Sequence, residues 1–145
     1  MNVEIITEPL SLEMYGFSGI AVNRDYAATA FGLMDRMWKT VKLENLKNKG
    51  QNIWVYEQEH SVFAGVELDE ILNQNTGLEQ KRITLLKYAL YKHIGPYNLI
   101  KQAGLDMTAE LKRKGYSTTL PYVEIYGHWT KDETKLETSL LMCLI

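Results

Sequence analysis

The sequence contains a single cysteine, Cys143, and only three prolines among its 145 residues. One cysteine excludes an intramolecular disulfide and any zinc site that needs several cysteines. No apolar run approaches the roughly 20 residues of a membrane-spanning helix. The first residues, Met1–Glu8, lack the basic and apolar regions of a signal peptide. We therefore expect a cytoplasmic protein without a membrane partner.

The chain also lacks an excess of positive charge, since 16 Lys and Arg face 18 Asp and Glu for a net charge of −2. Domains that bind nucleic acids usually carry a basic face, so we expect no direct nucleic-acid partner. Only short clusters such as Lys112–Lys114 leave that possibility open. The three histidines have no spacing typical of metal ligands, and no phosphate-binding or dinucleotide motif occurs. We expect neither a metal nor a cofactor.

Hydrophobic residues make up 46% of the sequence, enough for one compact domain over residues 1–145. Alternation of apolar and polar residues predicts strands, and apolar residues recurring every three or four positions predict helices. The two kinds of element follow one another in a repeated order. The first half is expected to hold strands at 3–7, 10–17, 53–59 and 61–68 around a helix at 25–43. After a polar linker at 69–80, the second half is expected to hold strands at 82–93, 121–129 and 135–145 around a helix at 98–114.

This order is β-α-β-β twice over, with pseudo-repeats at about 1–70 and 80–145. It predicts an α+β fold in which the duplicated halves form one antiparallel sheet with two helices on one face. The opposite face would then be uncovered and would provide a ligand groove.

Side chains alternate between the two faces of a strand, and two predicted strands separate aliphatic from large amphipathic residues. Val123 and Ile125 share one parity, as do Ile53 and Val55, and both pairs suit packing beneath a helix. We therefore assign the other parity to the helix-free face; its members are Trp54, Tyr56, Gln58, Tyr122, Glu124, Tyr126 and His128.

Glu124 lies between two tyrosines in an otherwise apolar strand. Burying a carboxylate without a partner is costly, so it must be hydrated, paired, protonated or available to a ligand cation. Aromatic faces beside a carboxylate suit a flat organic cation. In the alternative interpretation, Glu124 pairs with a lysine and the tyrosines are ordinary strand residues.

The segments Lys87–Tyr97, Leu111–Gly115 and Pro121–Tyr126 resemble the GyrI-like small-molecule-binding superfamily. This superfamily includes the effector-binding domains of AraC- and MerR-type multidrug regulators. The Glu-Ile-Tyr-Gly-His-Trp run at 124–129 is most similar to stand-alone integron cassette-associated effector-binding proteins. In multidrug-binding members a strand glutamate neutralises cationic ligands, and Glu124 occupies the matching position.

The resemblance implies a module that binds bulky, lipophilic, cationic small molecules. Transcription regulation through a separate DNA-binding partner, sequestration of a compound and a role as a detached sensor stay open, as does a homodimer. The expected ligand-binding residues are Glu124, Tyr126, Tyr122, Tyr88, Trp54 and Tyr56. Two alternatives stay open. One is hydrolysis of cyclopropane-containing toxins, in which Glu124 would activate water beside a tyrosine hydroxyl. The other is a protein-interaction role such as gyrase inhibition. We expect a binding protein rather than an enzyme and assign no catalytic residue.

Overall fold

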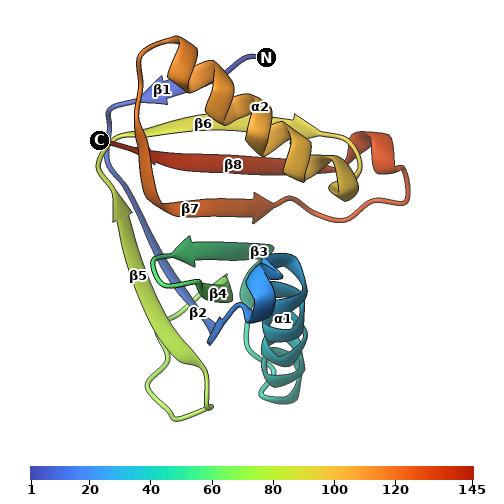
Figure 1. Cartoon of the computed structure of the whole chain (residues 1–145). Helices are drawn as coiled ribbons and strands as arrows, with labels where there is room; N and C mark the ends of the chain where they lie inside the picture. Colours follow the sequence, from blue (N-terminus) through green and yellow to red (C-terminus); the bar gives the residue numbers. More distant parts are fainter. The chain divides into compact units, whose positions relative to one another are not determined.

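The computed structural model describes residues 1–145 and divides into two compact units. Unit 1 contains Met1–Leu10 and Thr84–Ile145, and unit 2 contains Ser11–Ile83. Each unit combines antiparallel strands with one long helix (Figure 1). The predicted α+β class and the repeated order of strands and helices are confirmed. Neither helix has the length and apolar character that crossing a membrane requires.

Unit 2 is built around α1 (Tyr26–Leu43), which follows the short 3-10 helix η1 (Val22–Arg24). The Asp25 side chain caps α1 by accepting a hydrogen bond from the backbone N–H of Ala28 at 3.1 Å. The strands follow the order β3-β4-β2-β5. Their bounds are Leu10–Ile20 for β2, Asn48–Glu57 for β3, Ser61–Leu68 for β4 and Glu79–Leu85 for β5.

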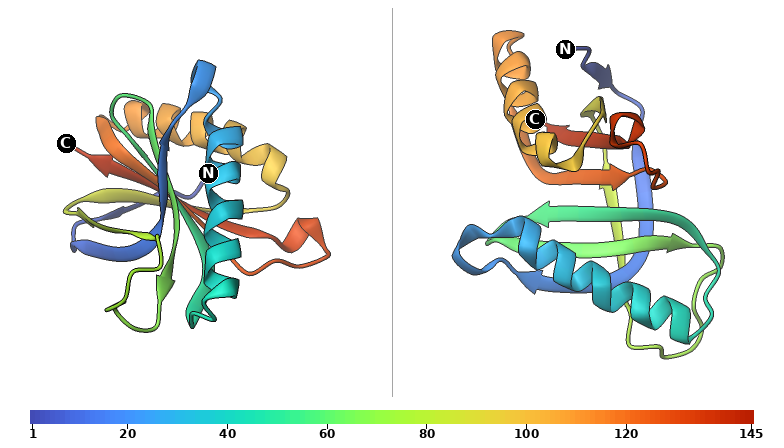
Figure 2. Two further views of the ribbon diagram at one scale, coloured as in Figure 1. Left: turned by 90° about the horizontal axis from the view of Figure 1, so that it is seen from below. Right: turned by 90° about the vertical axis from the view of Figure 1, so that its right-hand side faces the viewer.

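Residues at helical spacing along α1 bury one face of the helix against β4. Figure 2 shows α1 lying along the strands of its unit. Ala30 and Leu33 pack with Val62 and Ala64, and the next turns of α1 pack with Val66. The β3–β4 hairpin turns at Glu59 and His60, whose φ values are 60° and 61°. Positive φ at both central residues characterises the tight turns that match the twist of the two strands.

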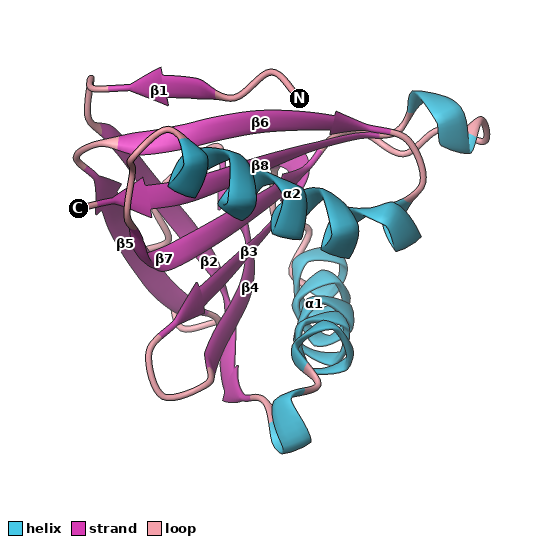
Figure 3. Ribbon diagram, turned by 45° about the horizontal axis from the view of Figure 1, so that its top comes forward, coloured by secondary structure: helices cyan, strands magenta, loops and turns pink.

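Unit 1 is built around α2 (Ile100–Arg113), preceded by η2 (Tyr97–Leu99). The strand order is β1-β6-β8-β7. The bounds are Glu4–Ile6 for β1, Tyr88–Ile94 for β6, Thr118–Tyr126 for β7 and Glu137–Leu144 for β8, and η3 (Glu133–Lys135) precedes β8. The buried stripe Ala103, Met107 and Leu111 of α2 packs with Leu140, Met142 and Leu144 of β8. Figure 3 shows α2 lying across the strands of this unit.

The single long strand predicted at 82–93 is wrong, because the chain breaks at Leu86 and Lys87 into β5 and β6. Leu86 is 70% exposed at this break. β5 pairs with β2 in unit 2, whereas β6 pairs with β1 and β8 in unit 1. The hydrophobic pattern is continuous through the break because both segments are sheet strands, so the pattern alone did not reveal their different partners.

Candidate functional site

A buried glutamate held by two tyrosine hydroxyls lies on β7. The Tyr122 hydroxyl donates to Oε2 of Glu124 and the Tyr126 hydroxyl donates to Oε1, each at 2.7 Å. Glu124 is only 7% exposed, and both tyrosines are half-buried. The three residues are two positions apart on one strand, so the pleat places them on the same face. Tyrosine hydroxyls are neutral donors that stabilise a carboxylate by hydrogen bonding.

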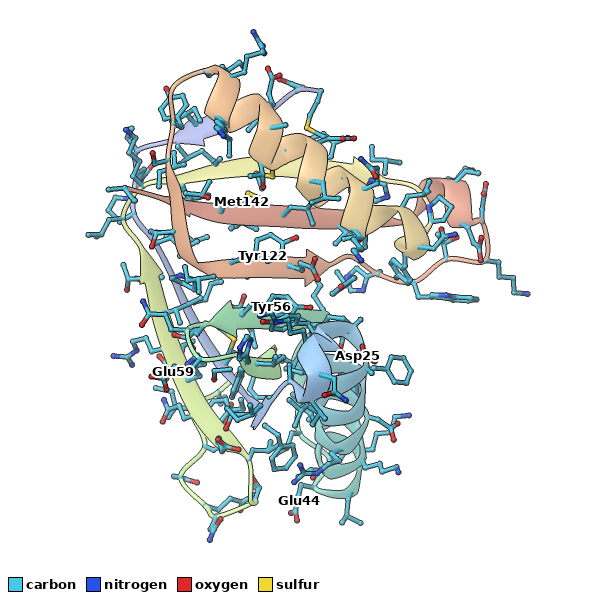
Figure 4. All side chains as sticks on the ribbon, viewed as in Figure 1. Asp25, Glu44, Tyr56, Glu59, Tyr122 and Met142 are labelled. Atoms are coloured by element: carbon cyan, nitrogen blue, oxygen red, sulfur yellow. The ribbon has the colours of Figure 1, made fainter.

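The face that carries this cluster is the one covered by α2, which corrects the expectation of a helix-free face. Tyr122 is paired with Met142 and Glu124 with Leu140 across β7 and β8. Leu140 and Met142 belong to the core beneath α2, and Tyr122 and Tyr126 pack against that core. Figure 4 shows Tyr122 on β7 and Met142 on the adjacent β8.

The opposite face of the same strands is also buried. Val123 is 0% exposed and its partner Leu141 is 2% exposed. The position of the aliphatic residues therefore did not show which face of β7 lies beneath α2, because residues on both faces are buried. The separation of residues by parity was predicted correctly, but the two faces were assigned the wrong way round.

Tyr97 extends the cluster from η2. Its ring meets the Tyr126 ring edge to face, with centroids 5.5 Å apart and an angle of 87° between the planes. Burial raises the pKa of the Tyr97 hydroxyl above its ordinary value of 10.0. Gly95, at φ 140°, and Pro96 turn the chain from β6 into η2 and so bring Tyr97 over the sheet. The sequence analysis did not include Tyr97 among the site residues, and its aromatic contact with Tyr126 was missed.

A pocket of about 290 Å³ lies beside Tyr122 in the same unit. Its lining comes from α2, β7 and β8: Thr108, Thr118, Thr119, Leu120, Tyr122 and Met142. Thr108 and Met142 were not predicted as site residues. Thr108 lies on α2, one position after the buried Met107, and no sequence signal separated it from an ordinary helix surface residue.

Trp54 and Tyr56 lie in unit 2, where they pack against the core formed by α1 and β4. Tyr56 meets Tyr26, the first residue of α1, with ring centroids 5.8 Å apart in an edge arrangement. The Tyr26 hydroxyl is hydrogen-bonded to Nδ1 of His60 at 2.5 Å. Both predicted residues therefore share the α1 face of unit 2 with further aromatic groups, rather than a helix-free face.

Tyr88 lies on the other side of its sheet from Glu124. In β6, Ala89 pairs with Met142 on the α2 face, and the preceding Tyr88 pairs with Cys143 on the reverse face. Burial, and secondarily the charge of Glu8, raises the pKa of the Tyr88 hydroxyl. Of the six predicted ligand-binding residues, the structure therefore brings together Tyr122, Glu124 and Tyr126, and it places Tyr88 apart from them.

The site thus combines a buried glutamate side chain, three tyrosine rings and an adjoining pocket without charged residues. Such a set suits an organic cation, because a carboxylate supplies charge and aromatic faces supply cation–π contact. A carboxylate beside tyrosine hydroxyls can also hold and orient a water molecule.

No protein-family model matches the sequence, and no curated protein sequence matches it either. Solved structures match its fold over nearly the whole chain. The C-terminal domain of EcmrR has a TM-score of 0.77 at 15% identity, covering 100% of this chain and 99% of that domain. The EcmrR chain in a complex with DNA has a TM-score of 0.66 at 13% identity, and the match covers 99% of this chain and 56% of that one.

SAV2435 bound to tetraphenylphosphonium has a TM-score of 0.67 at 18% identity, covering 100% of this chain and 94% of that one. A hydrolase from Listeria innocua has a TM-score of 0.60 at 11% identity, covering 99% of this chain and 91% of that one. An integron cassette protein from Vibrio cholerae has a TM-score of 0.52 at 16% identity, covering 99% of this chain and 95% of that one. The chain therefore shares its fold with a regulator's C-terminal domain, a drug-bound protein, a hydrolase and an integron cassette protein.

Proposed function

We propose that this chain is a cytoplasmic effector-binding module for bulky, lipophilic, cationic small molecules. The observation that carries the proposal is the buried carboxylate of Glu124 between the hydroxyls of Tyr122 and Tyr126. Two proteins of the same fold support it: the C-terminal domain of EcmrR and SAV2435 bound to tetraphenylphosphonium, itself a lipophilic cation.

In this proposal Glu124 provides the counter-charge, and the rings of Tyr122, Tyr126 and Tyr97 provide the aromatic contacts. The tyrosine hydroxyls hold the carboxylate in one position before the ligand arrives, which lowers the entropic cost of binding. Large aromatic surfaces with few directional contacts favour broad specificity among flat cations. The contribution of Trp54 and Tyr56 from unit 2 stays a prediction, as does membership of the GyrI-like superfamily.

The test compares a cationic rhodamine-type dye with a neutral dye of similar shape by fluorescence titration. Glu124→Gln keeps the side-chain volume and removes the charge, so it should weaken binding of the cationic dye by about 1–3 kcal/mol. Binding of the neutral dye should change little. Glu133→Gln, in the exposed η3 of the same unit, serves as the matched control. Equal affinity of wild type and Glu124→Gln for the cationic dye would contradict the counter-charge role.

A second candidate function is hydrolysis of a strained, toxin-like substrate. It is favoured by the 2.7 Å hydrogen bonds that place tyrosine hydroxyls beside a carboxylate, and by the fold shared with a hydrolase. Glu124 would accept a proton from a water molecule as the water oxygen bonds to a cyclopropane carbon and the strained C–C bond breaks. A tyrosine hydroxyl would donate a proton to the part of the substrate that takes up the released electron pair, and Glu124 would return its proton to the tyrosine. Incubation with a cyclopropane-containing alkylating toxin separates the two functions: turnover lost in Glu124→Gln supports the hydrolase, whereas binding without turnover supports the module.

As an effector-binding module, the chain would act in transcription regulation together with a DNA-binding part. The match to little more than half of the EcmrR chain in its DNA complex supports this arrangement. The net charge of −2 is consistent with a domain that does not itself hold DNA.

A further inference from the structure

The pocket beside Tyr122 is lined without any charged side chain. Three threonines, a leucine, a tyrosine and a methionine form its walls. A charged group placed there would lose hydration without gaining an ionic partner, which is costly. An uncharged group that is mainly apolar meets no such penalty, and the thioether of Met142 adapts readily to aromatic and branched surfaces.

The hydroxyl proton of Thr108 is already used within the protein. Its Oγ1 donates to the Gly104 carbonyl oxygen at 3.0 Å and lies 3.6 Å from Sδ of Met142. Thr108 therefore offers a ligand no proton, and the α2 side of the pocket favours apolar contact. At about 290 Å³, the pocket is at the lower end of the size range for small-molecule sites, so it suits one arm of a ligand rather than a whole drug.

Tyr122 connects the pocket to the glutamate. The same side chain lines the pocket and donates its hydroxyl proton to Glu124 at 2.7 Å. Residues two positions apart on a strand are separated by about 7 Å. We propose that the pocket is a subsite for an uncharged aryl or branched alkyl arm, about 7 Å from the cationic group that lies at Glu124. This inference rests on the proposed function and specifies its ligand as a cation with a spaced apolar arm.

The probes are two isomers, (3-phenylpropyl)trimethylammonium and (1-phenylpropyl)trimethylammonium. They have the same atoms and the same charge, but only the first can hold its ring several ångströms from the nitrogen. Wild type should bind the 3-phenyl isomer about tenfold more tightly, because only that ring reaches the pocket. Isothermal titration calorimetry measures both affinities.

Thr108→Phe fills the pocket from α2 and should remove the preference, leaving the affinity for the 1-phenyl isomer unchanged. Thr40→Phe is the matched control, because Thr40 also lies on a long helix and donates its hydroxyl to the carbonyl four residues earlier, at 3.3 Å. If Thr108→Phe does not fold, as judged by circular dichroism, Thr119→Phe narrows the pocket from an exposed strand position.

Retention of the preference in a folded pocket-filling variant would overturn the subsite. Equal binding of both isomers to wild type, with both weakened by Glu124→Gln, would also overturn it while leaving the proposed function intact. Failure of wild type to bind either isomer would overturn the proposed function and the subsite together.

Discussion

Glu124 and Thr138 are both buried polar residues on the α2 face of unit 1, but their surroundings differ. Each carboxylate oxygen of Glu124 accepts a tyrosine hydroxyl. Thr138, directly opposite Tyr126 on β8, is 0% exposed, and its hydroxyl has no hydrogen-bond partner. A buried hydroxyl without a partner loses its hydration and gains nothing in return. The α2 face of unit 1 therefore holds one well-satisfied polar group on β7 and one unsatisfied polar group on the adjacent β8.

Thr138→Val should raise the free energy of unfolding by about 1 kcal/mol, because a methyl group replaces the unsatisfied hydroxyl at nearly the same volume. Urea denaturation followed by tryptophan fluorescence measures the change. Thr119→Val, at an exposed position of the adjacent β7, is the control and should change stability little. A clear loss of stability in Thr138→Val would show that the hydroxyl forms a hydrogen bond in solution.

At the scale of elements, side chains reinforce the pairing of β2 and β5 in unit 2. Arg82 of β5 donates from Nη2 to Oε2 of Glu13 on β2 at 2.8 Å, and Gln80 donates to the other oxygen of Glu13. Farther along, the Ser18 hydroxyl donates to Glu79 at 2.6 Å. The hydrogen bond from Arg82 holds the pKa of Glu13 below its ordinary value of 4.5.

A lowered pKa in the folded state adds stability that is present above the unfolded pKa and is lost as the pH falls through the folded pKa. The free energy of unfolding should therefore decrease as wild type is acidified below pH 4.5, and this decrease should be smaller in Glu13→Gln. Chemical denaturation at several pH values measures both. Glu70→Gln, in the segment after β4, should behave like wild type. Identical pH profiles for wild type and Glu13→Gln would contradict the contribution of this pair.

At the scale of the whole molecule, the chain's first strand belongs to the unit formed mainly by its C-terminal half. β1 pairs with β6, with Ile5 opposite Ala89, and Val3 is buried in the α2 core. The next strand, β2, lies in unit 2 and pairs with β4 and β5. Each unit thus takes a strand from the opposite half of the sequence.

Deletion of residues 1–7 should therefore affect unit 1 more than unit 2. The amides of β6, Tyr88–Ile94, should exchange with deuterium faster, because their pairing with β1 and the packing of Val3 are lost. The amides of β4, paired within unit 2, should keep their protection. Hydrogen–deuterium exchange with mass spectrometry compares the two strands, and equal acceleration in both would contradict this division.

The sequence by itself determined the features that depend on local periodicity. Alternation along β7 placed Tyr122, Glu124 and Tyr126 on one face, and helical spacing defined α1 and α2. These features follow from the two-residue repeat of a strand and the 3.6-residue repeat of a helix, which do not depend on distant contacts.

The tertiary structure decided which face of β7 meets α2, how the segment at 82–93 divides between the units, and which distant residues join the site. Tyr97 and Thr108 reach Tyr126 and Tyr122 because η2 and α2 pack over β7. Both faces of β7 are buried, so hydrophobicity could not distinguish the helix side from the reverse side. That choice depends on packing between segments far apart in the chain, which the local pattern does not encode.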